Sequence, residues 1–327
     1  MSEHFIKEIE IKNFKCFEDF KSSGFGRVNL ISGKNNVGKT AFMEACYINV
    51  SSKTIPGMFT SLVGIKIRRE NLNILDKYVK NTFTPLDFTK KALDQTSDIT
   101  TKSNINESHF SVVKNDGIKE YIFKIADNKN VKINVNDFSF ETSYEKKINF
   151  IDSYGFSNAN MKDCYSSIQT MEKEEELNQK LKDFDSRIEA FKIIDNIPKC
   201  KIDNKYMEIT ELGDGVRHLV SIVTALYTSK NGYFFIDEIE NGIHYTNLDK
   251  LWRIILEISN KQGVQVFATT HSKECIESYA RVSKQLKDED IRFIELGMNK
   301  YNKLDATVMN SEMFLRFIEL GNEVRGW

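Results

Sequence analysis

Residues 33–40 read Gly33-Lys34-Asn35-Asn36-Val37-Gly38-Lys39-Thr40 and match G-x-x-x-x-G-K-[ST], the pattern of a phosphate-binding loop. In this pattern the glycines let backbone N–H groups close around an anion. The lysine reaches the outer phosphates, and the threonine hydroxyl binds Mg²⁺. The stretch therefore makes nucleotide binding the first hypothesis for this chain.

The sequence on either side of the loop is that of a strand and a helix, as a phosphate-binding loop requires. Residues 27–32 (RVNLIS) form a short apolar run typical of a buried strand. In residues 41–48, Phe42, Ala45 and Cys46 share one helical face and Glu44 lies on another. The start of this helix would direct its partial positive charge at the phosphates. An accidental glycine-rich turn does not explain both flanks.

The composition bounds the class of protein. A chain of 327 residues with 40% hydrophobic content supports one large or two modest domains. The 46 Lys and Arg residues against 47 Asp and Glu exclude an overall basic field for nucleic acid, although a local patch stays open. No signal peptide or membrane span is evident, so we expect a cytoplasmic protein without membrane contact. Widely spaced cysteines indicate a reduced chain without a metal site: Cys16, Cys46, Cys164, Cys200 and Cys275.

The pattern along the chain predicts four segments. Residues 1–50 form an N-terminal lobe with the phosphate-binding loop, 51–165 an α+β insertion, 166–200 a helical segment and 201–327 a C-terminal lobe. Within the insertion, the polar residues 94–108 predict a loop.

Two finer patterns lie in the middle of the chain. Residues 109–125 predict a hairpin that turns at Asn115-Asp116-Gly117, and further alternation occurs at 131–135 and 138–140. An amphipathic helix is predicted over 171–194 from apolar positions three and four apart: Leu177, Leu181, Phe184, Ile188 and Phe191.

Two apolar strands of the second half end in polar residues. Residues 233–238 (YFFIDE) end in Asp237 and Glu238. At this point in P-loop enzymes an aspartate holds the Mg²⁺ shell, and a following glutamate can act as general base. A helix N-cap is the structural alternative, and the upstream loop favours the catalytic interpretation. Residues 264–272 (VQVFATTHS) place His271 at the same sheet edge, within reach of a γ-phosphate or the attacking water.

A second glycine-containing turn, residues 211–217 (ELGDGVR), precedes a predicted helix at 216–229. Two glycines before a helix make another anion-binding N-terminus. One subunit cannot easily use two such sites on one nucleotide, whereas a dimer can if this turn closes over the partner's ATP. An ordinary N-cap turn is the alternative. Among the other histidines, His244 is open to a role in a subunit contact, and His4, His109 and His218 are interpreted as structural.

These elements, in this order, resemble the ATPase heads of the ABC class, of the SMC/RecF/OLD type. They resemble in particular the compact AAA family ATPases of prokaryotic phage-defence loci. The resemblance covers residues 1–50 and about 200–327, and it rests also on IKNFKCF (11–17), IDEIENGIH (236–244) and ATTHS (268–272). It implies an α/β fold: an ABC-type P-loop head with a mixed central sheet, flanking helices and an N-terminal antiparallel β subdomain, which carries the α+β insertion.

The resemblance also implies roles for individual residues, with ATP and Mg²⁺ as cofactors. Thr40 and Asp237 would hold the metal, and Glu238, His271 and Lys39 would be catalytic. The triphosphate of one subunit would be bound by the Walker A loop, namely Gly33, Lys34, Asn35, Asn36, Val37, Gly38, Lys39 and Thr40. The signature turn of the partner would contribute Gly213, Asp214, Gly215 and Arg217. Residues 240–244 correspond to a D-loop, and Lys15 would lie near the phosphates.

Two features depart from this pattern. The signature lacks the serine hydroxyl of Leu-Ser-Gly-Gly-Gln, for which Arg217 would substitute in part. A Q-loop glutamine is not identified, and Gln95 and Gln169 are only candidates.

The expected role follows from the family. OLD proteins continue into a TOPRIM nuclease domain, for which the residues after His271 leave no room. The resemblance thus implies an ATPase sensor of antiviral defence, a homodimer or higher homo-oligomer that controls a separate effector, a nuclease or toxin. A RecF-like DNA-maintenance ATPase and an ATP-binding scaffold with little turnover are the alternatives. A transporter subunit fits less well.

Overall fold

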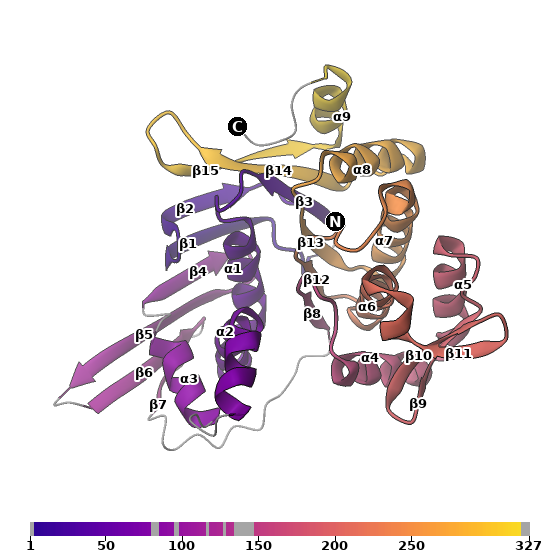
Figure 1. The fold of residues 1–327 in the computed structure, drawn as a ribbon. Coiled ribbons are helices and arrows are strands. Elements are labelled where there is room, and N and C mark those ends of the chain that lie inside the picture. Colours follow the sequence, from indigo (N-terminus) through magenta and orange to yellow (C-terminus); the bar gives the residue numbers. More distant parts are fainter. Residues whose placement is uncertain are drawn as a thin grey trace.

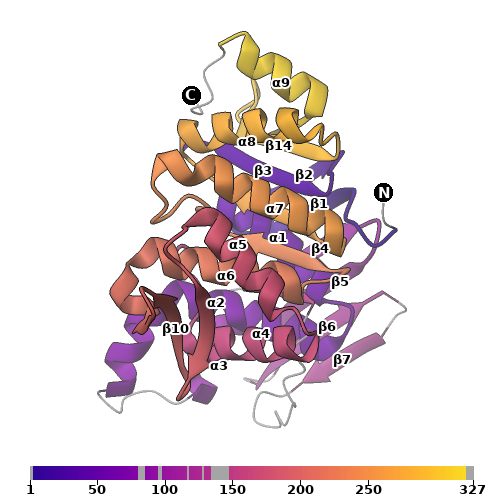
Figure 2. The same ribbon diagram turned by 90° about the vertical axis from the view of Figure 1, so that its right-hand side faces the viewer.

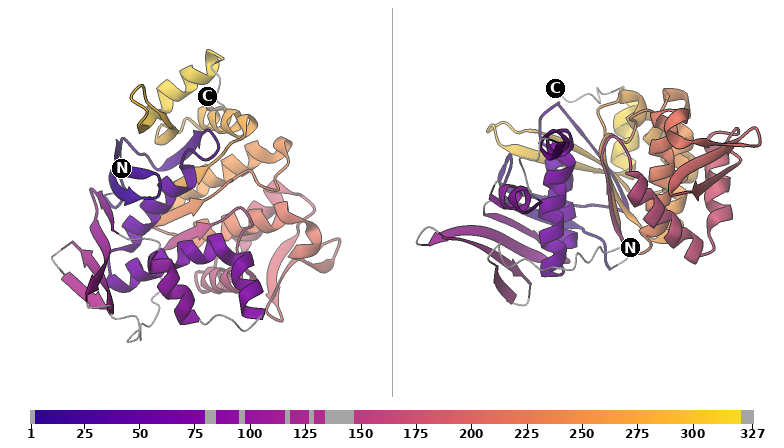
Figure 3. Two further views of the ribbon diagram at one scale, coloured as in Figure 1. Left: turned by 60° about the vertical axis from the view of Figure 1, so that its left-hand side comes forward. Right: turned by 60° about the horizontal axis from the view of Figure 1, so that its bottom comes forward.

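The computed structural model describes residues 3–79, 85–94, 98–115, 118–126, 129–133 and 147–321. Its elements form layers around a six-stranded central sheet (Figure 1). Helices α1 and α2 lie between this sheet and a second, antiparallel sheet, and the other face is covered by helices from the second half of the chain (Figures 1 and 3). The predicted fold class, an α/β head with a mixed central sheet and an N-terminal antiparallel β unit, is confirmed.

The central sheet has the order β15-β14-β3-β13-β12-β8. Five strands run parallel and β15 is antiparallel to β14. Both faces of the inner strands are buried, which explains their continuous apolar sequences. The strands predicted before the loop and before the acids are β3 and β12, and the strand before His271 is β13. The bounds are β3 (Val28–Gly33), β8 (Ile148–Ile151), β12 (Tyr233–Ile236), β13 (Gln265–Thr269), β14 (Ile291–Met298) and β15 (Leu304–Asn310).

The second sheet is antiparallel throughout, in the order β2-β1-β4-β5-β6-β7. It confirms the predicted hairpin, because β5 pairs with β6. Residues 116–117 of the predicted turn lie outside the described residues, as do residues 134–140, which include most of the alternating pattern predicted after the hairpin. The loop predicted at 94–108 is wrong for Ile99–Ser103, which forms β4, and for residues 107–108, which begin β5. β1 and β5 bind the backbone of β4 on both sides, and its β-branched threonines suit a strand. The bounds are β1 (Glu8–Phe14), β2 (Phe17–Ser23), β4 (Ile99–Ser103), β5 (Glu107–Asn115), β6 (Ile118–Ile125) and β7 (Lys129–Ile133).

Two hydrophobic cores lie on the two faces of the central sheet. Ile31, Phe235 and Phe267 pack toward α1 and the antiparallel sheet, and Leu30 and Phe234 belong to the core of the opposite face. Helix α1 is buried along most of its length because it lies between two sheets. The first core is completed by α1 (Lys39–Ser51), α2 (Ile55–Val79) and α3 (Pro85–Asp94). The opposite side carries α4 (Asn158–Thr170), α5 (Glu174–Phe184), α6 (Asp214–Thr228), α7 (Leu248–Gln262), α8 (Lys273–Leu286), α9 (Ser311–Glu319) and the short turns η2 (Ile209–Leu212) and η3 (Tyr245–Asn247).

The helix predicted over 171–194 ends early, at Phe184. Asp185 takes an extended conformation, and the Ile188 amide bonds back to the Asp185 carbonyl. Phe191 is buried as expected, but it lies in a strand. Its backbone amide donates to Asn178 Oδ1 on α5 at 2.8 Å. The description of 166–200 as helical is therefore wrong after α5. A three-stranded antiparallel sheet follows, made of β9 (Ala190–Ile194), β10 (Ile197–Ile202) and β11 (Lys205–Glu208) (Figure 2).

The segment predicted as an insertion is built into both sheets. Its strand β4 pairs with β1, and its strand β8 pairs with β12 of the central sheet. The division of the chain at residues 50, 165 and 200 stays a prediction. Within the described part of the chain, no helix combines the length and the apolar character that a membrane crossing needs.

Candidate functional site

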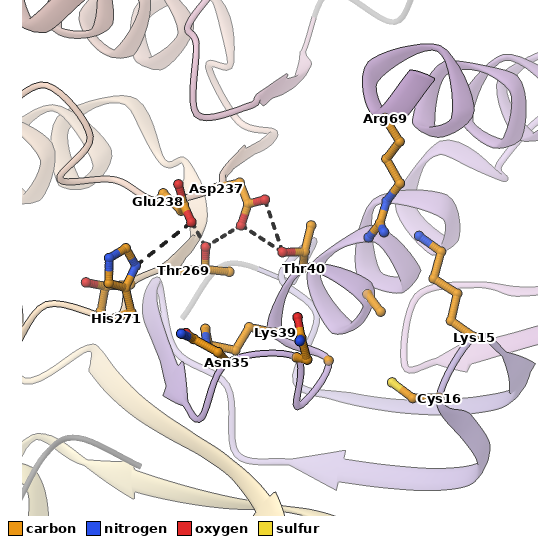
Figure 4. A pocket seen from close by; sticks show the side chains of 14 residues that line it. Lys15, Cys16, Asn35, Lys39, Thr40, Arg69, Asp237, Glu238, Thr269 and His271 are labelled. Atoms are coloured by element: carbon orange, nitrogen blue, oxygen red, sulfur yellow. Dashed lines mark hydrogen bonds and ion pairs between the residues drawn. The ribbon is translucent and has the colours of Figure 1, made fainter. Parts of the chain in front are cut away.

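A cavity of about 670 Å³ opens at the edge of the central sheet where β3, β12 and β13 end (Figure 4). The carboxyl ends of parallel strands meet there, so segments far apart in the sequence share one site. The cavity brings together the phosphate-binding loop, the two acids and His271. Its lining is Lys15, Cys16, Asn35, Asn36, Gly38, Lys39, Thr40, Ala41, Arg69, Asp237, Glu238, Thr269, Thr270 and His271.

The backbone of the loop requires glycine at two positions. Gly33 and Gly38 have φ of 147° and 111°, in the region that side chains rarely adopt. A Cβ on Gly33 would lie 2.4 Å from the Leu296 carbonyl oxygen, and one on Gly38 would lie 2.6 Å from Cys16 Sγ. Gly38 is also the N-cap of α1 and offers no side-chain oxygen to the amides of the first turn. Those amides are therefore suited to an anion such as a phosphate.

The ammonium group of Lys39 lies against the loop itself. Its Nζ donates to the carbonyl oxygens of Gly33 at 2.8 Å and Lys34 at 3.0 Å. Burial lowers the pKa of Lys39, and the nearby charges of Asp237 and Glu238 oppose that shift. The lysine is thus a cation placed at the rim of the loop, where it suits the outer phosphates of a nucleotide.

Thr40 and Asp237 form the oxygen cluster that a magnesium ion needs. Thr40 Oγ1 lies 3.0 Å from both carboxylate oxygens of Asp237, and Thr269 Oγ1 lies 2.5 Å from Asp237 Oδ1. Mg²⁺ prefers oxygen ligands and is commonly held by one or two carboxylates with substrate phosphates and water. This donor set fits such an ion. Groups of three or more His, Cys, Asp or Glu with metal-binding geometry do not occur among the described residues.

Glu238 and His271 lie at one end of the cavity, and Glu240 lies beside the histidine. Glu238 has φ of 51°, and its amide donates to Thr269 Oγ1 at 2.9 Å, while its side chain is 47% exposed. His271 Nδ1 lies 3.9 Å from Glu238 Oε1 and 3.5 Å from Glu240 Oε1. The Glu240 carboxylate also accepts from the His271 amide at 3.2 Å. Glu240 therefore orients the histidine, a contact that the sequence pattern did not predict.

Lys15 and Arg69 line the other end of the cavity (Figure 4), and both pair with Glu44 to form a charged cluster. The Glu44 carboxylate is 3% exposed and pairs with Lys15 Nζ. It also accepts from Arg69 Nε at 2.8 Å and Arg69 Nη2 at 2.9 Å. Burial lowers the pKa of Lys15, against the opposing charge of Glu44. Lys15 lies in the cavity, as expected, whereas Arg69 was missed because its helix carries no motif.

The signature turn lies outside this cavity, so the structure does not bring it to the loop of its own chain. Gly213 has φ of 87° and precedes α6. A Cβ on Gly215 would lie 2.2 Å from the Gly242 carbonyl oxygen, so the turn packs directly on the segment predicted as a D-loop. Arg217 donates to the Phe156 carbonyl at 2.7 Å. Its guanidinium is thus engaged within the chain.

The remaining candidates lie away from the cavity. Gln169 donates to Glu174 on the far side of the central sheet, and Gln95 lies outside the described residues. His244 is exposed, and its Nδ1 lies 2.9 Å from Thr246 Oγ1. His218 is buried, which lowers its pKa to about 4, in keeping with a structural role. The cysteines are all free.

The sheet order, the phosphate-binding loop and the Thr40–Asp237 pair define a P-loop head with the ABC-type fold. The family profile described as "AAA ATPase domain" matches residues 65–276, which is more than half of the chain. The chain therefore belongs to this family.

Individual relatives agree with this class. An "ATP/GTP phosphatase" of Helicobacter pylori is 28% identical over 334 residues, which cover 86% of this chain and 89% of that protein. The "DNA replication and repair protein RecF" of Bacillus cytotoxicus is 44% identical over 50 residues, which cover 15% of this chain and 13% of that protein. A solved "SmcHead bound to the C-winged helix domain of ScpA" superposes with a TM-score of 0.53 over 94% of this chain and 99% of that chain. At 12% identity it shows the fold alone.

Proposed function

We propose that this protein hydrolyses ATP in a Mg²⁺-dependent reaction and uses the cycle to open and close a dimer. The observation that carries the proposal is the contact of Thr40 Oγ1 with both oxygens of Asp237 at 3.0 Å, in a cavity that also holds Lys39, Glu238 and His271. The similarity to an ATP/GTP phosphatase over most of both chains supports hydrolysis.

Each group has a role that its position suits. Lys39 and the amides at the start of α1 would bind the phosphates, and Thr40 with Asp237 would hold the metal. Mg²⁺ supplies positive charge that neutralises the phosphates when it is bound. Glu238, half-exposed to the cavity, accepts a proton from the attacking water. His271 lies next to Glu238 and is held in place by Glu240. From there it would contact the γ-phosphate.

The dimer completes each site. The signature residues Gly213, Asp214, Gly215 and Arg217 lie outside the cavity of their own chain, at the start of a helix that suits an anion. They pack on the segment containing Gly242, so the two segments form one surface. Two exposed aromatic residues adjoin it: Tyr154, 79% exposed, follows a residue that is hydrogen-bonded to Asn241, and Tyr245, 65% exposed, directly follows residues 240–244. A second copy of the chain that covers this surface with its own loop would enclose two ATP molecules, one at each end.

What the dimer controls is the finer part of the proposal. We infer an antiviral sensor that switches a separate nuclease or toxin, and this part rests on the family resemblance alone. The similarity to RecF and to SMC heads supports a DNA-bound ATPase equally well. Binding to duplex DNA that weakens steeply with salt would favour that alternative. ATP-dependent capture of a protein encoded beside this gene, with no DNA binding, would favour the sensor.

Steady-state phosphate release tests the proposed reaction. We expect Glu238→Gln to slow release by roughly 100-fold or more while ATP binding persists, since the amide cannot act as general base. If the wild type releases phosphate as slowly as Glu238→Gln, the protein is an ATP-binding scaffold with little turnover instead. Asp19→Asn, which removes an exposed carboxylate on β2 outside the cavity, is the matched control and keeps the wild-type rate.

A further inference from the structure

The charged cluster of Lys15, Glu44 and Arg69 has no role in the hydrolysis proposed above, yet Lys15 and Arg69 line the cavity. Figure 4 shows them on the opposite side of Thr40 from Glu238 and His271. In a phosphate-binding loop the lysine reaches the β- and γ-phosphates, and backbone amides cradle the α- and β-phosphates. If the γ-phosphate faces Glu238, as the proposed function requires, the nucleoside points toward Arg69.

The guanidinium of Arg69 is a rigid, flat surface. Its Nε and Nη2 form a two-point contact with the Glu44 carboxylate, at 2.8 and 2.9 Å, which fixes the plane of the group. Glu44 itself cannot move easily, because it is 3% exposed and also pairs with Lys15. The in-plane contact leaves the faces of the guanidinium free, and the Arg69 side chain is 46% exposed.

Flat surfaces suited to a nucleobase are few in this cavity. Its described lining residues include no Phe, Tyr or Trp, and His271 lies at the end that receives the γ-phosphate. Arginine guanidinium planes stack on bases as aromatic rings do. We propose that Arg69, oriented by Glu44, is the platform on which the purine base of the bound nucleotide stacks. Stacking uses the face of the base rather than its edge, so ATP and GTP bind with similar affinity.

Binding experiments with and without a base test this assignment. Isothermal titration measures the affinity of the full chain for Mg-ATP, Mg-GTP and Mg-tripolyphosphate, which has phosphates but no base. We expect Arg69→Ala to weaken ATP and GTP binding by the same factor, roughly 5- to 100-fold, and to leave tripolyphosphate binding unchanged. Arg69→Lys keeps a positive charge beside Glu44 but loses the plane, so it should behave like Arg69→Ala.

Arg68 provides the matched control on the same helix. Its guanidinium lies over the rings of Phe150 at 4.4 Å and Tyr47 at 5.0 Å, and it does not line the cavity. Arg68→Ala therefore removes an identical group from α2 and should keep the wild-type ratio of ATP to tripolyphosphate affinity. A drop in that ratio with Arg68→Ala as large as with Arg69→Ala would overturn the assignment, because any loosening of α2 would then suffice.

The other outcomes separate this proposal from the proposed function. Equal loss of ATP and tripolyphosphate binding in Arg69→Ala would mean that the residue binds phosphate, and full ATP affinity in Arg69→Lys would mean that only charge matters. Either result overturns the stacking role and leaves the ATPase intact. A wild-type chain that binds neither ATP nor tripolyphosphate would instead refute the proposed function.

Discussion

Gly215 of the signature turn packs on Gly242 in the segment of residues 240–244. The substitution Gly215→Ala tests what that contact does. The new Cβ would lie 2.2 Å from the Gly242 carbonyl oxygen and 3.2 Å from its carbon. Relief requires the start of α6 and the loop to separate by roughly 1 Å, an overpacking that costs about 1–3 kcal/mol. The melting temperature should fall by roughly 2–10 °C, so the chain stays folded at 25 °C.

The larger expected effect is on hydrolysis. Displacing the signature turn should lower ATPase activity at least about tenfold, because the turn contacts the partner's nucleotide in the proposed dimer. Lys39→Ala inactivates the other half of the same composite site. In an equimolar mixture about half of the dimers pair the two variants, and one of the two sites in each is intact. Phosphate release should therefore recover to about a quarter of the wild-type rate, provided that the subunits exchange.

If subunit exchange is shown with differently tagged chains and the mixture still releases no phosphate, the composite sites are refuted. Recovery requires that the signature turn acts in trans, since neither variant has an intact site of its own. Gly297→Ala is the matched control, because a Cβ there meets nothing within 4 Å and Gly297 does not line the cavity. It should keep the wild-type melting temperature and activity.

Three further predictions concern single groups. His218 has a pKa of about 4 in the folded chain against an ordinary 6.5, so the unfolded state binds more protons between these values and stability is lost as the pH falls from 6.5 to 4. This loss amounts to about 3 kcal/mol of the free energy of unfolding, and the urea unfolding of His218→Leu should not show it between pH 6.5 and 4. The same pH dependence in the variant and the wild type would contradict the burial argument. Thr40→Val removes the hydroxyl beside Asp237, so the dependence of ATP affinity on Mg²⁺ should weaken in titrations with and without the ion. An unchanged dependence would remove Thr40 from the metal site. Glu44→Gln weakens the pairing of a buried carboxylate with the half-exposed Arg69 and should lower the free energy of unfolding by about 1–2 kcal/mol. An unchanged free energy of unfolding in urea would show that the cluster does not stabilise the fold.

The local patterns of the sequence predicted the parts of the site that depend on short stretches of backbone. A strand, a glycine-rich turn and the start of a helix are set by neighbouring residues. The loop that ends in Lys39 and Thr40 could therefore be predicted from the sequence motif alone. The same holds for the acids at the end of β12 and for His271 at the end of β13. Parallel strands end at one edge, which made the meeting of these residues predictable before any contact was seen.

Other elements were decided by packing between distant segments. The polar residues of β4 form a strand because β1 and β5 offer hydrogen bonds on both sides, and local composition does not record that environment. Phe191 continues a helical spacing, yet its strand is fixed by pairing with β10 and by Asn178. In both cases long-range pairing outweighed the local preference of the segment.

The site shows the same division. The sequence by itself determined the phosphate-binding loop, the acids and the histidine, because each is a local arrangement with its own chemistry. Only the tertiary structure brought Arg69 of α2 onto Glu44 of α1, and Glu240 onto His271. Those pairs depend on how α2 packs between two sheets and on how two loops meet at one edge (Figure 1). Such contacts join residues that share no motif, so their positions follow from the folded core rather than from spacing along the chain.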